Sequence, residues 1–139
     1  MSDSQRFPVA AHVLAYLAHK DALAADSAVS SAELAQSVAT NPVVVRRVTA
    51  MLARAGLIGT RRGASGGAWL TRPAREIGLD AVLRAVNGGG HMGVPPVGSK
   101  DCPVGERLPK AVQAAINAAD EAAARQLGST SVADLLTVE

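Results

Sequence analysis

The sequence predicts a mainly α-helical fold, a winged helix-turn-helix with a two-stranded wing and a long helix near the C-terminus. Three observations predict it. Helical segments at 31–38 and 42–55 are separated by a three-residue turn, a glycine-rich hairpin follows at 57–71, and residues 107–127 form a long alanine-rich helical stretch. With 48% apolar and 19% charged residues over 139 positions, the composition is that of a globular domain.

Spacing and capping predict the first two helices. Apolar residues recur at helical spacing within 8–20, which indicates the first helix. Ser30 and Glu33 form the S-x-x-E pattern of a capping box, in which each side chain accepts a hydrogen bond from the other residue's backbone N–H. This pattern predicts that the second helix occupies residues 31–38.

The third helix sorts its residues onto two faces. It follows a turn at 39–41, begins at Pro42, whose missing N–H has no partner at a first helical position, and ends before Gly56. A basic outward face on the second helix of a helix-turn-helix is typical of insertion into the major groove of DNA. The packing face carries Val44, Val45, Val48, Met51, Leu52 and Ala55, and the outward face carries Val43, Arg46, Arg47, Ala50 and Arg54.

The wing is expected from two strand-like segments, LIGT and AWLT, joined by RRGASGG at 61–67. Glycine lets a backbone approach phosphates closely, and arginines such as Arg61 and Arg62 can enter a minor groove. The alternative is an ordinary glycine-rich turn with two solvated arginines. Taken alone, the hairpin does not decide between the two.

We expect the rest of the chain to form a short helix, a loop and a long helix. A short amphipathic helix is expected from Ile77 to Asn87, and the long helix becomes regular after Pro109. The apolar stripe of the long helix suits either a symmetric dimer contact or packing back on its own domain. That stripe consists of Leu108, Val112, Ala115, Ile116, Ala119, Ala123 and Leu127. The expected boundaries are 1–87 for the DNA-binding domain, 88–106 for a flexible sensor loop, and 107–139 for the dimerisation helix and a self-capped tail.

Positive charge is concentrated in one part of the chain. Between Glu33 and Glu76 there is no acidic residue but seven arginines, whereas the remainder carries seven basic and twelve acidic residues. This asymmetry suits a polyanionic partner; the alternative, a solvated charged face, usually mixes signs and uses lysine. The seven are Arg46, Arg47, Arg54, Arg61, Arg62, Arg72 and Arg75.

Composition also limits which cellular compartment and which class of protein we expect. No apolar run reaches the length of a membrane span, and the nearly neutral start MSDSQR argues against a signal peptide, so we expect a cytoplasmic protein with no membrane partner. The single cysteine, Cys102, excludes an internal disulfide and a metal site built from several thiolates of one chain. Because no catalytic set of nucleophile, base and orienting acid is visible, we expect no enzyme.

The order of these features resembles the Rrf-two family of bacterial transcriptional regulators, which includes the iron-sulfur cluster regulator and the cysteine-metabolism repressor. The resemblance covers nearly the whole chain and is most specific in ARAGLI, RRGASGG and SVADLL. It implies a winged-helix homodimer held together by the long helix, with its wings at the minor groove of a palindromic operator. Cluster-binding members carry three cysteines in the loop; this chain has Cys102 alone, so we expect no iron-sulfur cluster, other cofactor or metal.

Carried over by position, the resemblance implies which residues contact DNA. The base contacts correspond to Val43, Val44, Arg46 and Arg47 of the third helix and to Arg62 of the wing. Arginine can bond guanine bidentately, and valine can contact a thymine methyl. Phosphate contacts are expected from Arg54, Arg61 and Arg72, and the site also includes Gly63 and Ser65 at the wing tip.

The expected function is sequence-specific binding of double-stranded DNA by a transcriptional regulator, specifically a repressor. The alternative is a protein-interaction module whose basic face docks an acidic partner. For the signal, Cys102 is either a redox-sensing thiol, helped by Lys100 and opposed by Asp101, or an inert one. A small-molecule effector between the winged domain and the long helix is a further candidate.

Overall fold

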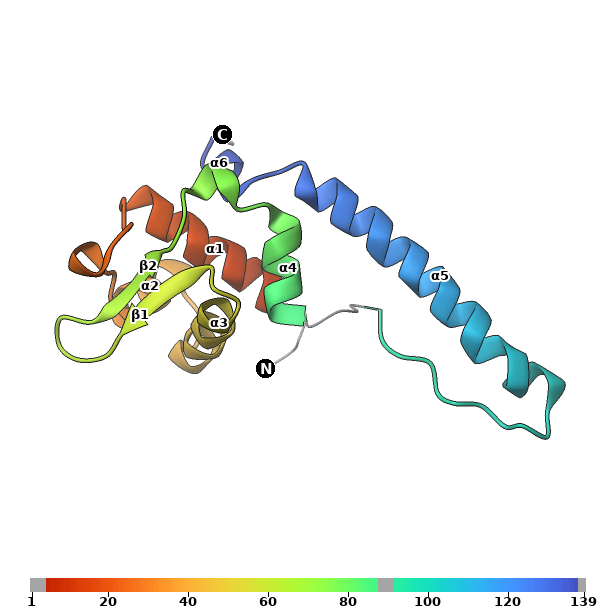
Figure 1. Ribbon diagram of the computed structural model, residues 1–139. Coiled ribbons are helices and arrows are strands. Elements are labelled where there is room, and N and C mark those ends of the chain that lie inside the picture. Colours follow the sequence, from red (N-terminus) through yellow and green to blue (C-terminus); the bar gives the residue numbers. More distant parts are fainter. Residues whose placement is uncertain (1–4, 88–91, 138–139) are drawn as a thin grey trace.

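The structure, a computed structural model, describes residues 5–87 and 92–137 and confirms the mainly helical fold (Figure 1). The order of elements confirms a winged helix-turn-helix followed by a long helix. Two short 3-10 turns, η2 and η3, precede α2 and α4. The elements are α1 (Arg6–His19), η2 (Ala25–Ser27), α2 (Ser31–Val38), α3 (Pro42–Arg54), β1 (Ile58–Arg61), β2 (Gly67–Leu70), η3 (Ala74–Glu76), α4 (Leu79–Asn87), α5 (Pro103–Gly128) and α6 (Val132–Leu135).

Short polar side chains fix the starts of the helix-turn-helix. Ser30 Oγ accepts a hydrogen bond from the N–H of Glu33 at 3.1 Å and caps α2. Asn41 Oδ1 accepts one from the N–H of Val43 at 2.9 Å and caps α3. Gly56, just beyond α3, has φ +80°, a left-handed conformation that glycine adopts at little cost. The predicted limits of both helices are therefore confirmed to within a residue.

The hairpin is fastened to the body along one edge. β1 and β2 pair antiparallel with Ile58 opposite Leu70, and both side chains are buried. On the other side of β2, Ala68 and Val29 exchange two backbone hydrogen bonds of 2.9 Å each. Gly67 passes so close to the carbonyl of Val29 that a Cβ there would collide with it. The wing thus has a fixed attachment to the segment that leads into α2.

The hydrophobic core lies where α1, α3, α4 and the hairpin meet. Burial of each large aliphatic side chain stabilises the fold by roughly 1.5–3 kcal/mol. The tail returns to this core through Val132, whose N–H donates to the carbonyl of Ile77 at 2.8 Å. The largest fully buried side chains are Leu14, Leu17, Leu34, Leu52, Leu70, Ile77, Val13, Val45, Val48, Val82 and Val132.

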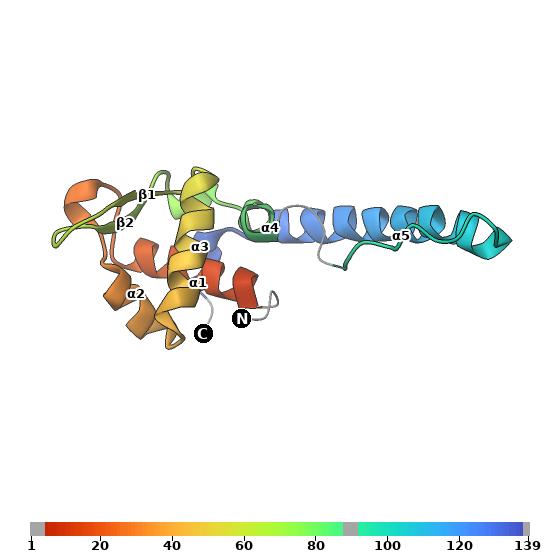
Figure 2. The same ribbon diagram turned by 90° about the horizontal axis from the view of Figure 1, so that it is seen from below.

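α5 leaves this body as an arm, visible from two directions in Figures 1 and 2. It packs against α4 near its C-terminal end, and no residue of the helix is buried. The alternative that the long helix packs back on its own domain is therefore wrong for most of its length. Among the described residues, no helix combines the length and apolar character needed to cross a bilayer.

The start of α5 corrects the expected boundary between loop and helix. The helix begins at Pro103 instead of residue 107, and Pro109 lies inside it. Proline at a first helical position costs nothing, whereas Pro109 leaves the carbonyl of Gly105 without its helical donor. Gly98 of the preceding loop lies close against that carbonyl, where a side chain would not fit. Of the expected loop, 92–102 lacks regular structure and 88–91 lie outside the described residues.

Candidate nucleic-acid interface

α3 presents its basic face to solvent, as its two-sided pattern predicts. Arg46, Arg47 and Arg54 are exposed, and Val43 between the cap and the first arginine is 44% exposed. Val44 is only 7% exposed and belongs to the core, so its assignment as a base contact is corrected. The helical spacing already placed Val44 on the packing face, and the carry-over from the family conflicted with it.

The wing tip projects beyond the body at the end opposite to the free end of α5, and α3 crosses the front of the body between the hairpin and α4 (Figure 2). The tip is a tight turn in which the N–H of Gly66 donates to the carbonyl of Gly63 at 3.0 Å. Gly63 has φ +106°, which side chains rarely adopt. Arg62, Gly63 and Ser65 are all exposed at this tip. A slender turn of this kind leaves the backbone free for close approach by a ligand.

A hollow of about 320 Å³ separates the wing from the start of α2 and from α3. Its wall combines hydroxyl groups and guanidinium groups with a floor of apolar side chains. The polar part of the lining consists of Ser30, Ser31, Thr49, Thr60, Arg61 and Arg62. Hydroxyl and arginine donors are the groups that contact phosphate oxygens in DNA complexes. Thr49 and the two serines were not foreseen, because nothing in the sequence shows that the wing leans over them.

The seven arginines of the acid-free segment are not neutralised by acidic side chains of the described residues. In the ranges that the structure describes, none of them forms a salt bridge with a carboxylate. All seven are exposed to solvent: Arg46, Arg47 and Arg54 on α3, Arg61 and Arg62 at the wing, and Arg72 and Arg75 after it. Arg61 differs from the others, because its guanidinium donates to two backbone carbonyls of the same chain.

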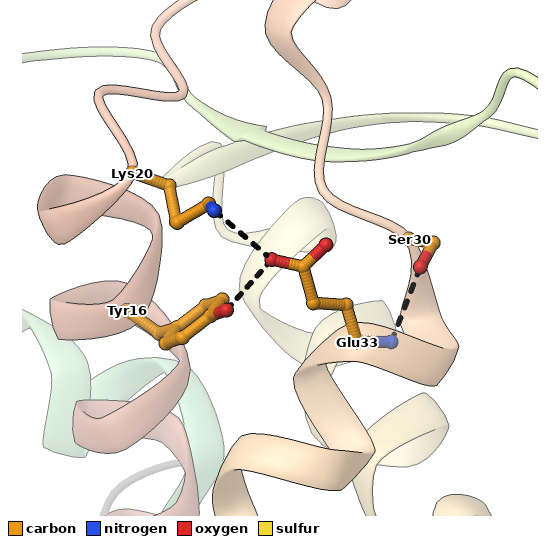
Figure 3. A network of polar contacts seen from close by, with 4 residues as sticks. All are labelled: Tyr16, Lys20, Ser30 and Glu33. Atoms are coloured by element: carbon orange, nitrogen blue, oxygen red, sulfur yellow. Dashed lines mark hydrogen bonds and ion pairs between the residues drawn. The ribbon is translucent and has the colours of Figure 1, made fainter.

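A polar network holds α2 against α1 (Figure 3). The hydroxyl of Tyr16 donates to Glu33 Oε2 at 2.6 Å, and Lys20 Nζ lies 3.6 Å from the same oxygen. The predicted capping box is therefore only half formed: Ser30 caps the helix, but the Glu33 side chain points to α1 instead of back to Ser30. The carboxylate of Glu33, accepting that hydrogen bond, raises the pKa of Tyr16, with smaller contributions from desolvation and negative charge.

The same two helices are joined one turn further along by His12 and Ser37, whose side chains lie 2.9 Å apart. His12 and Tyr16 are four residues apart on α1, and Glu33 and Ser37 are four apart on α2. This matching spacing places both pairs on facing stripes of two helices. Once the two helices are known to be neighbours, this spacing predicts the network from the sequence.

The fold and this basic surface match known regulators. Residues 3–138 match the Rrf2 family, described as iron-dependent transcriptional regulator. The chain belongs to the Rrf2 family. This confirms the resemblance seen in the sequence, and the Rrf2 relatives are transcriptional regulators and not enzymes. The protein is accordingly a winged-helix, DNA-binding regulator.

Two relatives support the Rrf2 assignment over the whole chain. YwnA of Bacillus subtilis (strain 168), a candidate HTH-type transcriptional regulator, is 32% identical over 134 residues, 96% of each chain. The crystal structure of a candidate DNA-binding protein, also 32% identical, superposes with a TM-score of 0.71 over 94% of this chain and 98% of that one. Oxidised CymR of Staphylococcus aureus superposes with a TM-score of 0.65 at 22% identity, covering 100% and 98%, which shows the common fold.

The iron in the Rrf2 description does not fit the residues of a single chain. Iron-sulfur clusters are held mainly by cysteine thiolates, and the chain has a single cysteine. Within the described ranges, no three histidine, cysteine, aspartate or glutamate side chains converge as metal ligands would. A single chain therefore does not supply the cysteine ligands of a cluster.

Cys102 is the exposed residue directly before α5. Hydrogen bonds from the backbone N–H of Gly105 and, secondly, of Val104 lower the pKa of its thiol, opposed by slight desolvation. The expected effects of Lys100 and Asp101 are not what shifts this pKa; the first turn of α5 does. Donors at a helix start favour the thiolate, which is the reactive form of cysteine.

Proposed function

We propose that this Rrf2 protein is a cytoplasmic, homodimeric repressor that binds a palindromic operator through α3 and the wing. The observation that carries the proposal is the exposure of seven arginines, none in a salt bridge within the described residues, on one acid-free segment that forms both elements. Such a surface attracts a duplex and neutralises its phosphates.

We propose a role for individual residues from their positions on these elements. Arg46 and Arg47 lie on the exposed face of α3, where guanidinium groups can bond guanine edges in the major groove. Val43 offers a methyl-sized apolar contact for thymine. Arg54 and Arg72 supply phosphate contacts, and Arg62 enters the minor groove with Gly63 and Ser65 close to the backbone.

Homodimerisation is supported by the apolar face that α5 leaves exposed. Val104 is 63% exposed, Leu108 53% and Val112 38%, and these three lie one helical turn apart along the arm. A contiguous apolar stripe of this kind is typical of a protein contact. A second copy of the chain is the occupant that also gives two DNA-binding units related by a two-fold axis.

The signal input is proposed to be oxidation of Cys102 or a small ligand bound against α5. A peroxide would transfer one oxygen to the Cys102 thiolate and leave as hydroxide or alkoxide, giving a sulfenic acid at the start of the helix. Comparison of operator affinity for wild type and Cys102→Ser, with and without peroxide, tests this. We expect the response to peroxide to be lost in Cys102→Ser. An equal response in both proteins would exclude the thiol, and no response in either would favour the small ligand.

The experiment that tests DNA recognition is selection of bound duplexes from a random library. We expect two enriched half-sites related by a two-fold. Arg46→Ala or Arg47→Ala then costs about 1–3 kcal/mol on the selected operator and much less on random duplex. Arg84→Ala, which removes an exposed arginine of α4 that is paired with Asp80 and lies outside α3 and the wing, is the control. Failure to enrich any duplex would favour an interaction module with an acidic protein partner.

A further inference from the structure

The two arginines of the wing are adjacent in sequence but differ in their partners. The Nη2 atom of Arg61 lies 3.2 Å from the carbonyl oxygen of Ser65 and 3.4 Å from that of Ala25 and donates to both. The side chain of Arg62, by contrast, has no hydrogen bond or ion pair within the part of the chain that the structure describes. One guanidinium is thus engaged by the protein, and its neighbour faces solvent.

The two carbonyls that Arg61 bridges belong to different parts of the molecule. Ser65 is in the turn at the wing tip, and Ala25 begins η2, the short turn before α2. The η2 segment continues directly into the Val29 bridge to β2 and then to the Ser30 cap of α2. Arg61 therefore connects the far end of the wing to the start of the helix-turn-helix.

Such a connection stabilises the wing tip, which has few ordering interactions of its own. The ladder between the two four-residue strands of the wing ends at the pair Arg61 and Gly67, so the turn at 62–66 lies beyond the strand pairing. The tip contains glycines, which lose more conformational freedom on ordering than other residues. The Nη2 group of arginine carries two N–H donors in a fixed plane, which suits two carbonyls at once.

We propose that Arg61 is a positioning residue, which fastens the wing tip to η2 before DNA binds, and that Arg62 is the wing cation that contacts DNA. This changes the sequence-based expectation that Arg61 is a phosphate contact. A wing held in place before binding loses less conformational freedom in the complex, so the brace increases affinity without touching DNA. The part concerning DNA rests on the proposed function; the brace itself does not.

The brace is tested first in the free protein by amide hydrogen exchange. The N–H of Gly66 bonds to the carbonyl of Gly63 inside the tip and reports its opening. Arg61→Ala and Arg61→Lys lose the charged hydrogen bonds to Ser65 and Ala25. The Gly66 N–H should therefore exchange about tenfold faster in both variants. Arg62→Ala should leave this rate unchanged, and amides of the core helix α3 should keep their protection in all three variants. Equal exchange at Gly66 in wild type and both Arg61 variants would overturn the proposal.

DNA titration then separates positioning from direct contact. Arg61→Lys keeps the charge but replaces the planar fork by a point donor, so we expect about tenfold weaker binding to duplex with an unchanged salt slope. Arg62→Ala should instead make the slope shallower, because a cation that helps to neutralise the duplex is removed. Wild-type affinity in Arg61→Lys would show that only charge matters and would contradict a positioning role. If the wild type binds no duplex, the proposed function fails, and hydrogen exchange alone decides the brace.

Discussion

The body and the arm of this protein differ in whether their apolar side chains are buried. The body, α1 to α4 with the hairpin and α6, buries its apolar side chains in one continuous core. The arm, residues 92–128, has no buried residue and exposes valines and leucine along one side of α5. Both regions have apolar stripes at helical spacing in the sequence. The difference teaches that such a stripe predicts a contact but not whether the partner lies in the same chain.

The sharpest contrast concerns the free energy of unfolding. Leu52 is fully buried in α3, so Leu52→Ala should lower it by about 2–5 kcal/mol because a cavity remains. Leu108→Ala in the arm should leave the unfolding of the body nearly unchanged, since no core contact is lost. Denaturant titrations at one protomer concentration compare the two. Equal losses would mean that the arm is part of the same cooperative core.

Charge placed on the exposed stripe should break assembly without unfolding the body. Leu108→Asp is expected to convert dimers to monomers and to weaken operator binding about a hundredfold, because two linked half-site contacts become one. Sedimentation velocity and operator titration measure the two effects. Asn117→Asp adds the same charge on the opposite side of α5, where the side chain is exposed, and is the matched control. A Leu108→Asp protein that remains dimeric would place the dimer contact elsewhere.

Within the body, the hydrogen bond between Tyr16 and Glu33 can be tested through the ionisation of Tyr16. Tyr16 is the single tyrosine of the chain, so tyrosinate absorbance reports its ionisation alone. Its raised pKa means that the neutral phenol is favoured in the folded state. The resulting stability is complete below the pKa of tyrosine in the unfolded chain and is lost as pH rises through the raised folded pKa.

Removing the acceptor should undo this shift. In Glu33→Gln the titration of Tyr16 is expected to move down towards the ordinary tyrosine pKa, because both the charged hydrogen bond and the negative charge are lost. Glu76→Gln, in η3, removes another carboxylate and should leave the curve in place. A Tyr16 titration that is the same in wild type and Glu33→Gln would show that the hydrogen bond is not formed in solution.

The smallest effect is expected at the start of the arm. The lowered pKa of Cys102 should appear as alkylation whose rate rises with pH at a lower midpoint than in the unfolded chain. The thiolate then stabilises the folded state above the pKa of the unfolded thiol, and that contribution is lost as pH falls through the lowered folded pKa. Identical midpoints in folded and unfolded protein would mean that the N–H groups of Gly105 and Val104 do not reach the sulfur.

Local signals predicted the body well, because its caps and turns act within a few residues. Ser30, Pro42 and Gly56 located the helix-turn-helix, and the reciprocal bonds of Ser131 and Asp134 confirm the predicted cap of α6. The arm was predicted less well. Pro109 suggested a later helix start, but Pro103 already begins the helix and a loop glycine packs on the carbonyl that Pro109 leaves without a donor.

The candidate site was predictable in composition but not in arrangement. The acid-free run of arginines and the two faces of α3 could be predicted from the sequence, because both follow from residue type and helical period. The bonds of Arg61 to Ser65 and Ala25 and the turn of Glu33 towards Tyr16 depend on tertiary neighbours. Val44 shows the reverse case: helical spacing was right, and the positional analogy was wrong.

The central claim is that the exposed arginines of α3 and the wing bind a DNA duplex. The most direct test measures the duplex binding constant over a range of salt for wild type and for the double variant Arg54→Ala, Arg72→Ala, which removes two of the proposed phosphate contacts. The account predicts a steep linear decrease of log K with log salt in the wild type, about 0.9 per phosphate neutralised, and a shallower one in the double variant. A slope near zero in the wild type, on operator and random duplex alike, would contradict it.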